Sequence, residues 1–170
     1  MAHELHFLKR AALIIRQEAD PLVIKTILVA TDFSETATKA IDAAVEFAKK
    51  FEAQLIVLHA YRVEIPMASP MTAGGYVLPD GFFEQLGSHA RNQVEATAKE
   101  IEARGVKAIG LAVEQSAAIA IVEEAKTRPV DLIVMGTRGL TGLKHVALGS
   151  VADRVVRTAP CPVLTIGISE

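Results

Sequence analysis

The chain has 170 residues, of which 51% are hydrophobic and 22% are charged, and its formal net charge is −2. This length predicts one domain. The small negative charge and the lack of Trp argue against a nucleic-acid partner, which calls for basic and aromatic surfaces. No segment approaches the roughly 20 apolar residues of a membrane span. A single Cys161 and a start without a small-residue cleavage site predict a cytoplasmic protein.

Residues 1–23 are interpreted as an amino-terminal helical extension. Before Pro21, apolar residues recur at helical spacing, namely Leu5, Leu8, Ala12 and Ile15. We expect this stretch to pack on its own domain or in a dimer. A partner-binding or membrane-surface helix is the alternative, and the balanced charges of the stretch argue against the membrane.

Residues 24–170 are predicted to form a single domain in which strands and helices alternate. Five runs of strand length are apolar on both faces, as in a covered parallel sheet: 25–30, 54–61, 106–113, 130–136 and 162–167. Four stripes at helical spacing lie between them: Ala37, Ile41, Ala44, Val45 and Ala48; Phe83, Leu86, Ala90, Val94 and Ile101; Ala118, Ile121, Val122 and Ala125; Val151, Val155 and Val156. This alternation predicts an α/β fold with a five-stranded, doubly wound parallel sheet.

Two smaller features complete the survey of the chain. Residues 62–80 contain three Pro and two Gly and predict an irregular surface loop, either a lid over a site or simply a long connection. Cys161, at the edge of the last strand, is interpreted as a small core residue rather than a reactive thiol.

The carboxyl ends of the strands are where a ligand site is expected in such a sheet, at the point where the strand order reverses. Asp32 follows the first strand and Gly136 ends the fourth. If the strand order is 3-2-1-4-5, these two strands are neighbours. Asp32 and the loop from Gly136 to Ser150 would then face the same crevice.

The loop 136–150 suits an anion such as phosphate. Its glycines allow sharp bends and close approach of backbone N–H groups to a ligand, and its charged residues are Arg138 and Lys144, with no carboxylate. We expect Ser150 to act as N-cap of the last helix, with Asp153 completing a variant capping box. An anion would then sit at the start of that helix. A glycine-rich turn with ordinary capping is the alternative. Neither a P-loop nor a G-x-G-x-x-G motif is present.

Three segments together resemble the universal stress protein family: "ILVATDFSETATKAIDAAVEFAKK", "LIVLHAY" and "VDLIVMGTRGLTGLKHVALGSVADRVVRTAPCPVLTIG". The last one contains the nucleotide signature of that family, G-x2-G-x9-G-[ST], at Gly136, Gly139, Gly149 and Ser150. The resemblance covers residues 24–168. It implies an adenine-nucleotide alpha-hydrolase-like (Rossmann-like) fold with strand order 3-2-1-4-5, and a homodimer through the last strand.

The same resemblance implies roles for individual residues. Asp32 would lie against a ribose, with the Ala30 and Thr31 backbone nearby. Ala60 and Met135 would line an adenine pocket, and Gly136 would approach the ribose. The phosphates would contact the loop and the helix start, at Arg138, Gly139, Gly149, Ser150 and Val151. Gln115 stands where the family usually has glycine, and we expect it to tighten one wall. His59 is interpreted as a packing residue rather than a catalyst.

These features predict a nucleotide-binding module that acts in a stress response through an unidentified protein partner. ATP is the expected ligand, with ADP or AMP as alternatives and with or without Mg²⁺. We expect no catalytic residue and no metal site within the protein, because phosphoryl transfer requires a placed nucleophile and usually carboxylate-bound metal. The alternative is a slow ATPase or self-phosphorylating enzyme, with Ser150 or Thr141 as acceptor. A scaffold that binds nothing is disfavoured by the intact loop.

Overall fold

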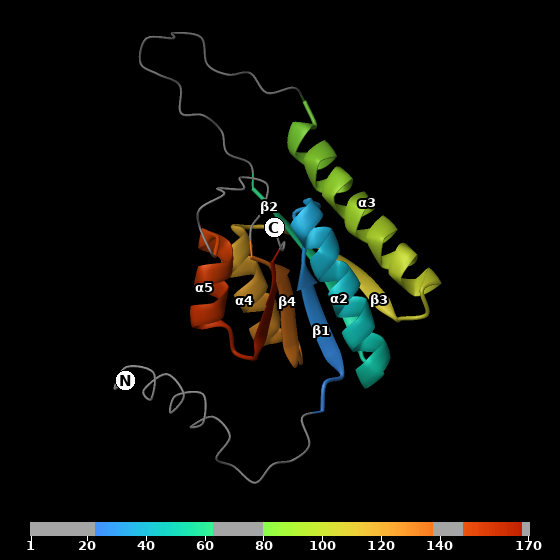
Figure 1. Cartoon of the computed structure of the whole chain (residues 1–170). Helices are drawn as coiled ribbons and strands as arrows, with labels where there is room; N and C mark the ends of the chain where they lie inside the picture. Colours follow the sequence, from blue (N-terminus) through green and yellow to red (C-terminus); the bar gives the residue numbers. More distant parts are fainter. Residues whose placement is uncertain (1–22, 63–79, 138–147, 168–170) are drawn as a thin grey trace, which may run out of the picture.

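The computed structural model describes residues 23–62, 80–137 and 148–167. They form one parallel β-sheet between two layers of helices (Figure 1). The elements are β1 (Thr26–Ala30), α2 (Glu35–Phe51), β2 (Gln54–Tyr61), α3 (Phe82–Ala103), β3 (Ala108–Glu114), α4 (Ala117–Thr127), β4 (Leu132–Gly136), α5 (Ser150–Thr158) and β5 (Val163–Ile166). The strand order is β3-β2-β1-β4-β5, and every neighbouring pair is parallel. The predicted doubly wound α/β fold with order 3-2-1-4-5 is confirmed.

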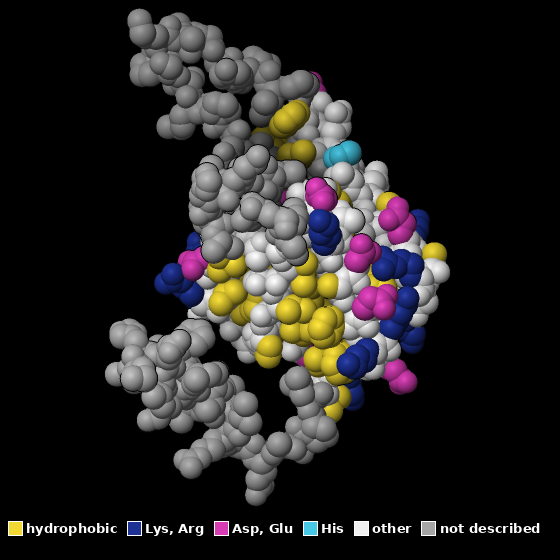
Figure 2. Space-filling model, in the orientation of Figure 1, with side chains coloured by type: hydrophobic (Ala, Val, Ile, Leu, Met, Phe, Trp, Pro, Cys, Tyr) yellow, Lys and Arg dark blue, Asp and Glu magenta, His cyan; other side chains and the backbone are white. Residues whose placement is uncertain are grey.

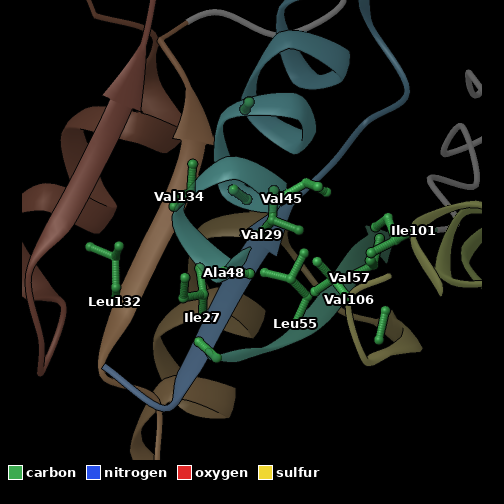
Figure 3. Close-up of a cluster of buried hydrophobic side chains, with 14 of the residues drawn as sticks. Ile27, Val29, Val45, Ala48, Leu55, Val57, Ile101, Val106, Leu132 and Val134 are labelled. Atoms are coloured by element: carbon green, nitrogen blue, oxygen red, sulfur yellow. The ribbon is translucent and has the colours of Figure 1, made fainter. Parts of the chain in front are cut away.

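Two hydrophobic cores lie on opposite faces of the sheet, because successive side chains of a strand point to opposite sides. On β1, Ile27 and Val29 pack under α2, whereas Leu28 and Ala30 face α4 and α5. Figure 3 shows the first core, in which Val45 and Ala48 of α2 lie over β1. Full burial of each large aliphatic side chain favours folding by about 1.5–3 kcal/mol. The central strands therefore anchor the fold.

The two edge strands are less buried than the sequence predicts. Ile109 of β3 is 53% exposed, and all four residues of β5 are only partly buried. On its covered face β3 meets α3 closely, since a Cβ on Gly110 would lie 2.6 Å from the Val94 carbonyl carbon. The expectation that helices cover both faces is therefore wrong for these two strands. In the described part of the chain each layer holds two helices, and these do not span all five strands (Figure 1).

Some expected members of the helical stripes are not in the core. Phe83 is 48% exposed, because the first turn of α3 extends past the strands (Figure 1). On α5, Val155 is fully buried, but Val151 and Val156 are exposed. This short helix buries only Ala152 and Val155 against the sheet. The other stripes are confirmed, with Leu86 and Ile41 partly buried.

Several expectations fall on segments outside the described residues. The amino-terminal extension up to residue 22 and the loop from residue 63 to residue 79 belong to these segments. Within the described part of the chain, no helix is both long and apolar enough to cross a membrane.

Asp131 joins the amino ends of β1 and β4. Its Oδ2 atom accepts hydrogen bonds from the backbone N–H groups of Lys25 (2.8 Å) and Thr26 (2.9 Å). In return, the Asp131 N–H donates to the Thr26 carbonyl oxygen at 2.9 Å. One carboxylate thus satisfies two neighbouring donors at the start of the central strand.

We expect Asp131→Ala to lower the free energy of unfolding by about 1.5–3 kcal/mol, because the substitution removes hydrogen bonds to a charged acceptor. Urea denaturation monitored by circular dichroism measures the change. Asp42→Ala is the matched control, since the Asp42 ion pair with Arg104 is exposed and should contribute less than about 1 kcal/mol. Equal effects of the two substitutions would contradict the role given to Asp131.

Candidate nucleotide site at the carboxyl ends of the strands

A cavity of about 280 Å³ opens at the carboxyl ends of β1 and β4. These strands are neighbours in the sheet, but the chain leaves β1 toward α2 on one face and leaves β4 toward α5 on the other. Such a reversal opens a crevice where α/β proteins bind ligands. The lining residues are Ala30, Thr31, Asp32, Ala37, Leu58, Ala60, Ala117, Ile121, Met135, Gly136, Thr137, Gly149, Ser150, Val151 and Ala152.

One wall of the cavity is the turn that connects β1 to α2. The Thr31 Oγ1 atom accepts from the Phe33 N–H at 2.9 Å, and the Asp32 carboxylate accepts from the Ser34 N–H at 3.1 Å. Ser34 is the N-cap of α2, and its hydroxyl accepts from the Ala37 N–H at 3.2 Å. Short polar side chains thus shape this turn by bonding their own backbone, and they hold Asp32 at the cavity wall.

The opposite wall is the start of α5. The Thr137 N–H donates to the Ile166 carbonyl oxygen at 2.8 Å, and the Gly149 N–H donates to the Thr137 carbonyl oxygen at 2.7 Å. These two bonds tie the start of α5 to the ends of β4 and β5. The described part of the glycine motif therefore comes together, as the sequence predicts.

The predicted capping of α5 is wrong. Gly149, not Ser150, is the N-cap, and it provides no side-chain hydrogen bond. The carboxylate of Asp153 bonds Arg157 at 2.9 Å instead of closing a capping box. Gly149 is the N-cap because its carbonyl oxygen accepts the first helical bond, from the Asp153 N–H at 2.9 Å, while its own N–H donates to Thr137. Helix geometry leaves the N–H groups of the first turn without an acceptor inside the helix, and these residues line the cavity.

The cavity is lined by both polar and aliphatic groups. Thr31, Asp32, Thr137 and Ser150 provide hydroxyl or carboxylate groups at the ends of β1 and β4 and at the start of α5. β2, α4 and β4 contribute aliphatic side chains to the lining: Leu58, Ala60, Ala117, Ile121 and Met135. Among the lining residues that the structure describes, Asp32 carries the one carboxylate, and none is Lys, Arg or His. This arrangement fits a ligand with a flat apolar part joined to a polar part.

Most of the predicted site residues line this cavity. Ala30, Thr31, Asp32, Ala60, Met135, Gly136, Gly149, Ser150 and Val151 are all lining residues. Arg138 and Gly139, like Thr141, Lys144 and His145, lie outside the described residues. Six further residues line the cavity without having been predicted from the sequence: Ala37, Leu58, Ala117, Ile121, Thr137 and Ala152. Strand alternation would have suggested Leu58, because it shares a face of β2 with Ala60.

Gln115 does not tighten the cavity wall as expected. Its side-chain amide donates to the Glu123 carboxylate at 3.0 Å, its backbone N–H donates to the Tyr61 carbonyl oxygen at 2.9 Å, and the lining residue of this segment is Ala117. Because the Gln115 side chain has an acceptor on α4, the small Ala117 defines the wall.

Cys161 is half-buried beside the second core. Burial raises the pKa of its thiol, the negative charge of Asp131 raises this pKa further, and a backbone hydrogen bond at Ile133 acts in the opposite direction. A raised pKa keeps the sulfur protonated at neutral pH, which fits a packing role rather than a reactive thiolate.

Known proteins share this sequence and this architecture. The sequence model of the Universal stress protein family matches residues 24–167. Universal stress protein YxiE of Bacillus subtilis is 38% identical over 143 residues, which cover 82% of this chain and 96% of that protein. The structure of universal stress protein UspA from Lactobacillus plantarum is 26% identical with a TM-score of 0.69, over 84% of this chain and 97% of that one. A universal stress protein solved in complex with cAMP is 25% identical with a TM-score of 0.58, over 86% of this chain and 99% of that one. The chain belongs to the universal stress protein family.

Proposed function

We propose that the protein binds an adenine nucleotide, namely ATP or alternatively ADP or AMP, in the cavity between Asp32 and the start of α5. The observation that carries this proposal is a cavity lined by both aliphatic side chains and polar groups, which include the start of α5, a helix whose N-cap Gly149 makes no side-chain hydrogen bond. The complex of a related universal stress protein with cAMP supports an adenine ligand. The proposed contact residues are Ala30, Thr31, Asp32, Ala60, Met135, Gly136, Arg138, Gly139, Gly149, Ser150 and Val151.

Each part of the nucleotide has a place in this proposal. The adenine ring would lie against the aliphatic lining residues Leu58, Ile121 and Met135. The ribose hydroxyls would donate to the Asp32 carboxylate. The phosphates would accept from the first N–H groups of α5, where the helix dipole also favours negative charge.

We further propose that binding, rather than turnover of the nucleotide, is the main activity, and that the bound protein acts on a protein partner in a stress response. The carboxylate of Asp32 already accepts from Ser34 and is assigned to the ribose. Metal-assisted phosphoryl transfer generally uses carboxylates near the transferred phosphate. Measuring phosphate release from ATP, with and without Mg²⁺, tests the alternative of a slow ATPase.

Gly149→Val is expected to weaken ATP binding by about 1.5–3 kcal/mol, the usual worth of one hydrogen bond to a charged group. Gly149 has φ −67° and ψ 159°, a backbone conformation that valine adopts freely, so the added side chain should act by blocking the phosphate site. Isothermal titration calorimetry with ATP measures the loss. Val156→Ala, an exposed change on the same helix, serves as control. Unchanged affinity of the Gly149 variant would contradict the placement of the phosphates at the start of α5.

Asp32→Ala is expected to weaken ATP binding by roughly 1.5–3 kcal/mol, because it removes a charged acceptor of the ribose hydroxyls. Inorganic tripolyphosphate, which lacks a ribose, should lose far less affinity. Asp32→Asn is the matched variant, since its amide oxygen keeps an acceptor for the Ser34 N–H while the charge is lost. If ATP and tripolyphosphate weaken equally, Asp32 acts through the fold, because loss of a negative charge alone would favour a polyanion.

We also propose a homodimer through β5. This strand pairs with β4 alone in the described sheet and so leaves one edge unpaired, which invites pairing with another strand. Hydrophobic side chains gather on the side of the molecule that carries α2 and β5 (Figure 2), where Ile41, Phe47, Leu164 and Ile166 are partly buried. Antiparallel pairing of two copies about a two-fold axis would cover both edges with one self-complementary contact.

Leu164→Lys, or alternatively Ile166→Lys, is expected to convert this dimer into a monomer, because either change places a charge in the shared apolar surface. Light scattering at micromolar concentration measures the mass. Ile109→Lys, at the exposed opposite edge of the sheet, should leave the mass unchanged. A wild-type monomer would refute the dimer, and a dimer that survives both β5 changes would move the interface elsewhere, with residues 1–23 as the next candidate.

A further inference from the structure

His59 and Phe33 form a small assembly behind the turn that carries Asp32. His59 follows Leu58 on β2, which is paired with Ala30 at the end of β1. Its Nδ1 atom lies 2.9 Å from the Thr31 carbonyl oxygen. A carbonyl oxygen only accepts hydrogen bonds, so Nδ1 is assigned the proton and donates. The imidazole also packs against the Phe33 ring, with centroids 4.7 Å apart and planes at 45°.

The turn needs such support because its backbone is unfavourable. Phe33 has φ 61°, in the left-handed region that residues with a Cβ seldom adopt. Hydrogen bonds to the Thr31 hydroxyl and to the Asp32 carboxylate hold the N–H groups of Phe33 and Ser34. His59 adds two contacts from a neighbouring strand, one to the backbone before Asp32 and one to the ring after it. Asp32 is therefore held on both sides by a single imidazole.

We propose that His59 is a positioning residue of the nucleotide site, which fixes the Asp32 carboxylate through the Thr31 carbonyl and the Phe33 ring. Neither His59 nor Phe33 is among the lining residues of the cavity, so both act through the turn. This inference rests on the proposed nucleotide function and assigns His59 a role beyond packing. It predicts that His59 matters for ligand parts that reach Asp32 and not for phosphate groups at α5.

The test uses two variants of the full chain. His59→Phe keeps a ring against Phe33 but removes the donor to Thr31. His59→Asn keeps a donor at the position of Nδ1. By calorimetry, we expect His59→Phe to weaken ATP about threefold to tenfold, the range that one hydrogen bond of average net worth supports. Its affinity for tripolyphosphate should stay within about twofold of wild type, and His59→Asn should restore most of the ATP affinity.

A second measurement does not depend on ligand. In the free protein, the backbone amide resonances of Phe33 and Ser34 should shift in His59→Phe and return toward wild type in His59→Asn. If His59→Phe does not fold, Phe33→Ala, which removes the ring contact from a half-exposed position, should show the same selective loss for ATP.

The outcomes separate the two proposals. A wild-type protein that binds neither ATP nor other adenine nucleotides overturns the proposed function, and the positioning role falls with it even if the amide shifts occur. Wild-type binding of ATP with unchanged affinity in His59→Phe overturns the positioning role alone. Equal weakening of ATP and tripolyphosphate also overturns it, because a general loss of structure then explains the effect.

Discussion

The parallel pairing of β1 with β4 is the constraint on which the cavity depends. These strands are adjacent in space although three helices and two strands lie between them in the chain. Because the chain leaves their carboxyl ends toward opposite faces, neither following helix closes the space above them. The turn at Asp32 and the start of α5 then face each other across a gap that backbone connections alone do not fill. Any change that loosened this pairing would alter both walls together.

The two ends of the central strands differ in their polar contacts. At the amino edge, Asp131 binds the backbone of Lys25 and Thr26 and fixes how β1 and β4 meet. At the carboxyl edge, polar groups bond locally within the turn after β1, and the cavity remains open. The buried strands and their starts hold the sheet together, and the proposed ligand site lies at the strand ends.

Much of the fold and part of the site can be predicted from the sequence, for identifiable reasons. The buried strands β1 and β4 are continuous apolar runs, and the polar residues after them mark the cavity. Exposure of Ile109 and Phe83 is not predictable in this way, because it depends on how far helices extend over the sheet. Local sequence patterns favour Ser150 over Gly149 as N-cap, and they do not reveal the bond of the Gly149 N–H to Thr137, twelve residues earlier. The contacts of His59 with Thr31 and Phe33 are likewise not predictable from the sequence, because they depend on the pairing of β1 with β2.

The glycine cap of α5 has a consequence for the energetics of this end of the molecule. A helix that begins with Ser, Asp or Asn completes its own first turn, whereas α5 begins with a residue that offers no side-chain acceptor. An anion that accepts from these N–H groups would take the place of the missing cap. Order in the first turn of α5 and occupancy of the cavity would then be thermodynamically coupled, each favouring the other by the same free energy. Thr137 connects this helix start to Ile166 of β5. Occupancy of the cavity by an anion would therefore also affect the β5 edge of the described sheet.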